Sequence, residues 1–150
     1  MARQHRTGAS RGRTARIGAV SAVIGLVLAA ATATAAAAGA DLLPPLESAA
    51  RATDPGFAGF SAARGQSFFD ATHGGKWSCS SCHTRNPLQA GRHAATGRPI
   101  KPLAPAANPQ RLSDPAKVDK WFRRNCRDVL ERECSPAEKG DVITYLLSLQ

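Results

Sequence analysis

Apolar and polar side chains recur with a helical period through the stretch WFRRNCRDVLEREC, residues 121–134, and the helix is predicted to begin after Asp114 and to end near Glu131. At about 100° per residue, Trp121, Phe122 and Val129 gather on one half of the helical wheel, and the basic side chains occupy the other. Asn125 falls near the centre of the apolar half. Burying an amide without hydrogen-bond partners costs about 1–3 kcal/mol in proteins, so we expect something in the interior to bind Asn125.

Two more helices are expected, one before and one after this stretch. The earlier one covers residues 60–72, and the later one buries Val142, Ile143, Leu146 and Leu149 on one face. Capping residues mark the three starts: Ser61, Asp114 with Pro115, and the Ser135/Glu138 capping box. No strand pattern stands out. The chain is therefore predicted to be all-α.

The segments outside these helices define the domain organisation. Residues 1–40 combine an arginine-rich start with an apolar, alanine-rich run and small-residue cleavage sites, which predicts an export signal. An uncleaved membrane anchor is the alternative. Residues 41–58 are expected to be a linker or N-terminal extension, and residues 59–150 one small domain. Within it, residues 74–114 form a long loop of the kind that surrounds a functional site.

Cleavage of the predicted export signal would lower the net charge of the mature protein. Of the 20 basic residues, five lie in residues 1–40 together with none of the 11 acidic ones, so the mature chain carries +4 rather than +9. Nucleic-acid binding is therefore not expected. The mature chain is also poor in large apolar side chains, and a buried prosthetic group would supplement its core. We expect the protein to be periplasmic and free of the membrane after cleavage.

The motif CSSCH, residues 79–83, carries the chemistry. Two thiols at this spacing form thioethers with the two vinyl groups of one haem, and the adjacent histidine then ligates the iron. Cys79 and Cys82 are thus predicted to bind haem c covalently, with His83 as the proximal iron ligand.

Other uses of these cysteines are weighed against haem. Cys126 and Cys134 could complete a zinc site with the motif, and the motif alone could be a redox dithiol. The two cysteine pairs have unlike spacings, however, and no βαβ pattern surrounds the motif. In an oxidising compartment Cys126 and Cys134 are expected to form a disulfide.

The sixth iron ligand determines what such a haem does. Met1 is the only methionine, so the mature protein cannot use the His/Met pair of ordinary electron carriers. His73, His93, Asn125, a lysine, water and an open site remain. Asn125 is preferred, because a haem plane would pack against the centre of an apolar helix face. An amide is a hard, weak ligand that suits ferric iron better than ferrous iron.

These motifs together resemble the SHP (sphaeroides haem protein) family, oxygen-binding relatives of the class I cytochromes c. The similarity runs from about residue 60 to residue 150 through CSSCHTRNPLQAGRHAATGRPIKPLAP, the W-F-x-x-N-C helix, C-x-x-x-E-x-x-D and a closing Y-L-L. It implies a class I cytochrome c-like fold, His83 and Asn125 as axial ligands, and a disulfide between Cys126 and Cys134. In that fold, Gly65, Phe69, Gly140 and Tyr145 would lie where the first and last helices cross.

The resemblance also implies a function. Asn125 would dissociate on reduction and let the ferrous haem bind oxygen, nitric oxide or carbon monoxide. Electron transfer is implied as well, from a dihaem cytochrome c and a membrane cytochrome b, and oxidase or nitric oxide dioxygenase-type activity would make the protein an oxidoreductase. A simple electron carrier with another sixth ligand is the alternative. The basic side of the Asn125 helix is either a docking face for an acidic donor or simply its solvated side.

Overall fold

A computed structural model of the chain describes residues 39–150. All but the last two residues of the predicted export signal lie outside the described residues. The elements run in the order α2 (Leu43–Thr53), α3 (Ala62–Asp70), α4 (Cys79–His83), β1 (Gly91–Arg92), β2 (Pro99–Ile100), α5 (Pro115–Leu130) and α6 (Pro136–Ser148). The predicted all-α class is confirmed, apart from a two-residue antiparallel ladder between β1 and β2. Within this range no helix is long and apolar enough to cross a membrane.

The first and last helices of the predicted domain cross at very close range. A Cβ at Gly65 of α3 would overlap the backbone carbonyl of Asp141 in α6, and a Cβ at Gly140 would overlap the ring of Phe60. The rings of Phe69 and Tyr145 pack beside the crossing, with centroids 5.7 Å apart. The crossing expected from the family resemblance is therefore confirmed.

Asp141 also ties the start of α3 to α6 by polar contacts. Its carboxylate accepts hydrogen bonds from the Ser61 amide at 2.7 Å and from the Arg64 guanidinium at 2.8 and 2.9 Å. The Asp141 side chain is 9% exposed. A carboxylate buried to this extent needs such partners. The hydrogen bonds of Asp141 to Ser61 and Arg64 therefore fix how α3 and α6 meet.

Side-chain caps set the starts of α3, α5 and α6, the three helices that the sequence predicts. Ser61 accepts from the amide of Arg64, and Asp114 accepts from that of Lys117. Ser135 and Glu138 form the reciprocal capping box of α6. Glu131, with a left-handed φ of 57°, ends α5 at the predicted residue.

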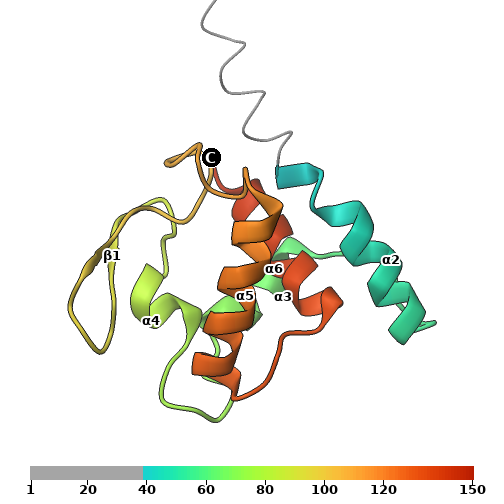
Figure 1. Cartoon of the computed structure of the whole chain (residues 1–150), viewed down its shortest axis with the longest axis horizontal. Helices are drawn as coiled ribbons and strands as arrows, with labels where there is room; N and C mark the ends of the chain where they lie inside the picture. The colour runs from blue at the N-terminus through green and yellow to red at the C-terminus, as the bar shows by residue number, and fades with distance from the viewer. Residues whose placement is uncertain (1–38) are drawn as a thin grey trace, which may run out of the picture.

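Residues 43–53, which composition assigned to a linker or extension, form a helix that packs on the domain. Leu42 and Ala50 are buried, and Leu43 and Leu46 lie against the main hydrophobic cluster. Figure 1 shows α2 along the side of the molecule opposite β1. Proline at its first turn suits the helix start, while the apolar face of so short a segment is recognisable only once α6 lies beside it.

Gly65→Ala should destabilise the fold even though alanine favours helices. The new methyl group must push the α6 backbone away, which we expect to cost about 1–3 kcal/mol and to outweigh the gain of about 1 kcal/mol in helix propensity. Denaturant unfolding measures the difference.

Gly56→Ala is the matched control, because its new Cβ would meet only the flexible side chain of Asp54, at 3.2 Å. Equal unfolding midpoints for Gly65→Ala and Gly56→Ala would contradict the close crossing.

Candidate haem-binding site

Helix α4 holds the three motif residues in one short turn. Ser78 caps it, accepting from the Ser81 amide, while the Ser81 hydroxyl accepts from the Ser78 amide. Cys79 and Cys82 are three residues apart and so lie on the same side of the helix. Both are partly buried free thiols. The arrangement presents two thiols and the adjacent His83 from one rigid element.

The long loop folds back over α4 through its small hairpin. A Cβ at Gly91 would overlap the backbone carbonyl of Cys82, so β1 packs directly on the motif. The Ala94 amide donates to the Cys82 sulfur at 3.2 Å. The buried Pro87 carbonyl accepts from the amides of Leu103 and Ala104. The expectation that this loop surrounds a functional element is thus met, although strands of two residues leave no sequence signal.

His83 is partly buried beside Phe69. Burial, with a smaller effect of the Arg111 charge, lowers the pKa of His83 to about 4. Its ring centroid is 6.4 Å from that of Phe69. The imidazole is therefore neutral at pH 7, which is the form that binds a metal ion.

Arg111 was missed by sequence reasoning. It is half-buried and donates to the carbonyls of Lys101 and Pro102, at 3.0 Å each. Nothing in its local sequence distinguishes it from the other basic residues of the loop. It is the cation whose charge acts on His83.

The thiol environment argues against a redox dithiol and a zinc site. Burial raises the pKa of Cys79 to about 11, whereas a reactive dithiol needs a lowered thiol pKa. Cys126 and Cys134 form a disulfide, with Cα atoms 5.6 Å apart, so neither can complete a zinc site. Nowhere in residues 39–150 do three or more histidine, cysteine or acidic side chains gather as a metal would need.

The disulfide predicted from the sequence is confirmed and anchors the end of α5. Cys126 lies in the last turns of the helix and Cys134 just before α6, and both are buried. The bridge closes the short segment that connects the two helices. It therefore holds the carboxyl-terminal half of α5, including Asn125, against the domain.

The sequence predicts Asn125 near the centre of the apolar face of α5. This prediction is wrong, because Asn125 does not lie on the face of α5 that the polypeptide buries. Its side chain is exposed, and none of the described residues hydrogen-bonds to it. The helical wheel places Trp121 on the apolar half, but its side chain is 46% exposed and stacks on Arg124, so the buried face is narrower than the wheel predicts. Phe122 and Cys126 form the inner face, and Asn125 lies at its edge beside Trp121.

The core nevertheless joins α5 to the motif. Cys79 from α4, Leu103 from the loop and Phe122 from α5 all pack against the same hydrophobic cluster. Asn125 is one helical turn beyond Phe122. The structure thus brings the motif and the Asn125 helix to one core, and the Asn125 amide has no hydrogen-bond partner among residues 39–150.

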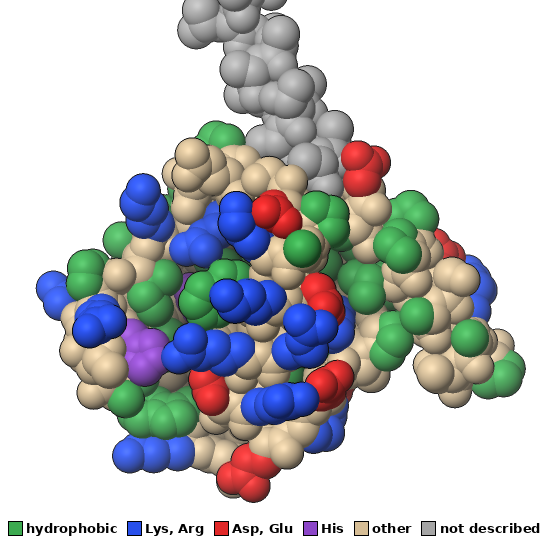
Figure 2. All heavy atoms as spheres, in the orientation of Figure 1, with side chains coloured by type: hydrophobic (Ala, Val, Ile, Leu, Met, Phe, Trp, Pro, Cys, Tyr) green, Lys and Arg blue, Asp and Glu red, His purple; other side chains and the backbone are tan. Residues whose placement is uncertain are grey.

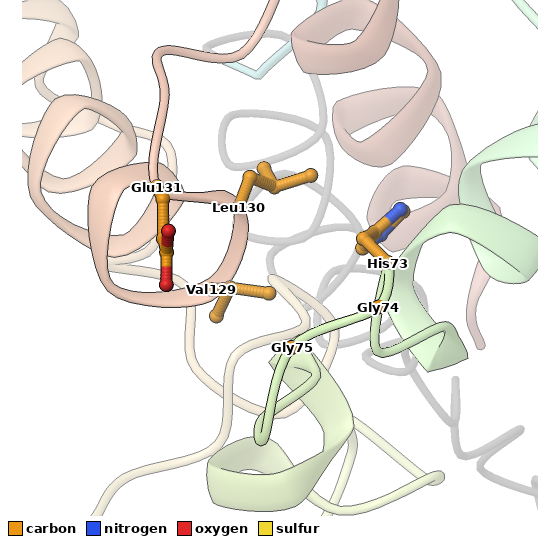
Figure 3. A pocket seen from close by; sticks show the side chains of 6 residues that line it. All are labelled: His73, Gly74, Gly75, Val129, Leu130 and Glu131. Atoms are coloured by element: carbon orange, nitrogen blue, oxygen red, sulfur yellow. The ribbon is translucent and has the colours of Figure 1, made fainter.

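The two histidines considered as rival ligands are engaged elsewhere. Figure 3 shows His73 beside Val129 and Leu130, at the carboxyl-terminal end of α5. Its Nε2 donates to the Phe68 carbonyl at 2.9 Å. His93 sits in the hairpin turn, where its Nδ1 accepts from the Thr96 amide at 3.2 Å.

These residues fit a covalently bound haem. Two free thiols share one face of α4, and the adjacent imidazole is neutral. Cys79 packs against a hydrophobic cluster that also receives apolar side chains from α3, α5 and the loop. The backbone of Gly91 approaches the motif as only glycine allows. A small helical domain built on C-x-x-C-H in this way has the site of a c-type cytochrome.

Comparisons with known proteins identify the family. Residues 55–146 match the family described as Domain of unknown function (DUF1924). The chain is 44% identical over 80 residues to cytochrome c'' of Methylophilus methylotrophus, covering 53% of this chain and 56% of that protein. It is 45% identical over 89 residues to cytochrome c-type protein SHP of Cereibacter sphaeroides, covering 57% and 68%.

Solved structures agree. The crystal structure of oxidised cytochrome c'' from M. methylotrophus superposes with a TM-score of 0.69 at 36% identity, over 77% of this chain and 97% of that one. The structure of oxidised SHP, described as an oxygen-binding cytochrome c, gives 0.64 at 41% identity, over 72% and 94%. The chain therefore belongs to the cytochrome c''/SHP family of monohaem c-type cytochromes, whose members imply covalent haem c at Cys79 and Cys82.

Removing the disulfide should loosen α5 without abolishing the fold. Replacing both Cys126 and Cys134 by serine should lower the free energy of unfolding by about 2–3 kcal/mol, the chain-entropy value for so short a loop. Denaturant unfolding of the variant measures the loss.

Wild-type protein unfolded with and without a thiol reductant is the control, since reduction should lower its midpoint in the same direction. If reduced and oxidised wild-type protein unfold at the same midpoint, the bridge does not hold α5 in place.

Proposed function

We propose that the protein is an exported cytochrome in which His83 binds the haem iron permanently and Asn125 binds it only in the ferric state. When bound, haem c supplies an iron that accepts one electron and, once ferrous, takes a diatomic ligand. The observation that carries the proposal is the position of the Asn125 amide, which no residue of the described chain hydrogen-bonds and which lies one turn beyond Phe122, on the core that the motif shares.

The side chains of the site have separate roles in binding the haem and its iron. Cys79 and Cys82 attach the prosthetic group, and α4 holds them in one turn. His83, neutral at pH 7, donates its imidazole nitrogen to the metal. Asn125 offers a carbonyl oxygen, a hard donor that ferric iron retains better than ferrous iron does. Its release on reduction leaves a site for oxygen, nitric oxide or carbon monoxide.

The structure of α5 is compatible with a side-chain ligand that dissociates and rebinds. Phe122 and the disulfide hold α5 on the core, so only the Asn125 side chain has to move. Without a methionine after Met1, the chain has no thioether to take the vacated position. Among relatives, SHP is described as an oxygen-binding cytochrome c, and a solution structure of cytochrome c'' addresses haem-ligand detachment.

The same proposal places the protein in an electron-transfer chain. Its arginine-rich leader sends it to the periplasm. There we expect it to receive electrons from other cytochromes, a dihaem cytochrome c and a membrane cytochrome b.

Asn125→Met should convert the protein into an ordinary electron carrier. A thioether remains on iron in both oxidation states, so the variant should give low-spin ferric and ferrous spectra and should not bind carbon monoxide. Wild-type ferrous protein should bind it readily. Absorption spectra of both oxidation states, with and without carbon monoxide, give the answer.

Lys120→Met is the matched control on an exposed position of the same helix and should behave as wild type. A wild-type ferrous protein that does not bind carbon monoxide would contradict the open site. A ferric spectrum of Asn125→Met identical to that of wild type would show that Asn125 is not an iron ligand.

A further inference from the structure

The distribution of acidic residues along the chain is strongly uneven. No aspartate or glutamate occurs between Asp70 and Asp114, whereas six lysines and arginines do. These 43 residues contain the haem motif, the hairpin and the rest of the loop. All lysine, arginine, aspartate and glutamate side chains in the segment around the haem attachment site are thus positively charged, although the mature protein as a whole carries only a small net positive charge.

The structure gives these six cations no acidic partners. The salt bridges of the described residues use cations outside this segment: Arg51, Arg64, Lys117, Arg123, Arg127, Arg132 and Lys139. On α5, for instance, Arg123 pairs with Asp119 and Arg127 with Glu133. The basic side of α5, which the sequence suggested as a docking face, is therefore neutralised at two of its four cations, while Lys120 and Arg124 have no salt bridge within residues 39–150.

Four of the six cations form one patch around the hairpin, which we call the hairpin patch: Arg85, Arg92, Arg98 and Lys101. All four are exposed. Arg92 lies in β1, and Arg98 and Lys101 flank β2. In Figure 2 the left of the molecule, where β1 lies in Figure 1, shows Lys and Arg side chains with no Asp or Glu among them.

The hairpin patch adjoins the haem attachment point. Gly91 packs on the Cys82 carbonyl, and the Ala94 amide donates to the Cys82 sulfur. A protein bound to this hairpin would lie next to the Cys82 thioether. Because electron transfer weakens steeply with distance, that is a favourable place for a redox partner.

The carboxylates of the haem itself are one alternative use for this charge. Arg111 suits them better than the patch does, because it is half-buried and held by the Lys101 and Pro102 carbonyls. The side chains of Arg85, Arg98 and Lys101 make no hydrogen bonds within residues 39–150 and remain available to an external partner.

We propose that the hairpin patch binds an acidic surface of the redox partner and that electrons pass at the haem edge beside Cys82. This inference rests on the proposed function, because it requires a redox-active haem. Unpaired cations at the edge of a site steer an oppositely charged partner and raise its association rate, in a manner that salt suppresses.

Small charged oxidants test the patch directly. Ferrous holoprotein is mixed with ferricyanide, a trianion, and one electron passes from ferrous haem to give ferric haem and ferrocyanide. Arg98→Glu should slow this reaction about three- to tenfold at low ionic strength. It should speed oxidation by the tris(phenanthroline)cobalt(III) trication, and Arg98→Lys should retain the wild-type rates.

Arg51→Glu is the matched control, with the same change in net charge on α2, on the side of the molecule opposite β1. Its rates should stay near those of wild type, and added salt should erase the effect of Arg98→Glu. Equal rates for Arg98→Glu and Arg51→Glu would overturn the proposal. Carbon monoxide binding by the same wild-type sample reports separately on the proposed function.

A membrane surface is the other kind of anionic partner. Co-sedimentation with phosphatidylglycerol vesicles distinguishes it. If wild-type protein binds the vesicles, and Arg98→Glu abolishes that binding without changing the ferricyanide rate, the patch serves lipid and the proposal is wrong.

Discussion

The close crossing of α3 and α6 is the contact on which the rest of the structure depends. Gly65 brings the two backbones together, and buried Asp141 bonds the first turn of α3 at the same place. Since α3 leads into α4 and α5 leads into α6, this one contact positions both ends of the haem-binding region. The glycine cannot be replaced without separating the helices, because it meets backbone rather than a movable side chain.

Around that crossing, a small protein assembles a site from three segments. The α4 turn presents thiols and imidazole, the loop closes over Cys82 through Gly91, and α5 contributes Phe122 to the common core. The disulfide then fixes the end of α5 that carries Asn125. Each segment is short and individually weak, so a covalently attached haem would supply much of the apolar contact that the chain lacks.

Short sequence patterns predict many of the helix starts, the haem attachment motif and the disulfide. Helix caps act within four residues, and so Ser61, Asp114 and the Ser135/Glu138 box gave helix starts that the structure reproduces. The C-x-x-C-H motif and the disulfide are likewise local in sequence. The family resemblance supplied the crossing at Gly65 and Gly140, which no local pattern contains.

Features that depend on tertiary contacts were not predictable. Helix α2 exists because α6 covers its apolar side, and the hairpin exists because β1 packs on Cys82. Arg111 acts on His83 only through the fold of the loop. The burial of Asn125 was misjudged because a tryptophan on a helix wheel counts as apolar, whether or not anything covers it.

The central claim is that the Asn125 amide binds iron in one oxidation state and leaves it in the other. Iron X-ray absorption of the wild-type protein, ferric and then ferrous, without added gas, measures the coordination number in each state. The account predicts that the iron loses one light-atom ligand on reduction and becomes five-coordinate. A ferrous iron that keeps all six ligands would contradict it.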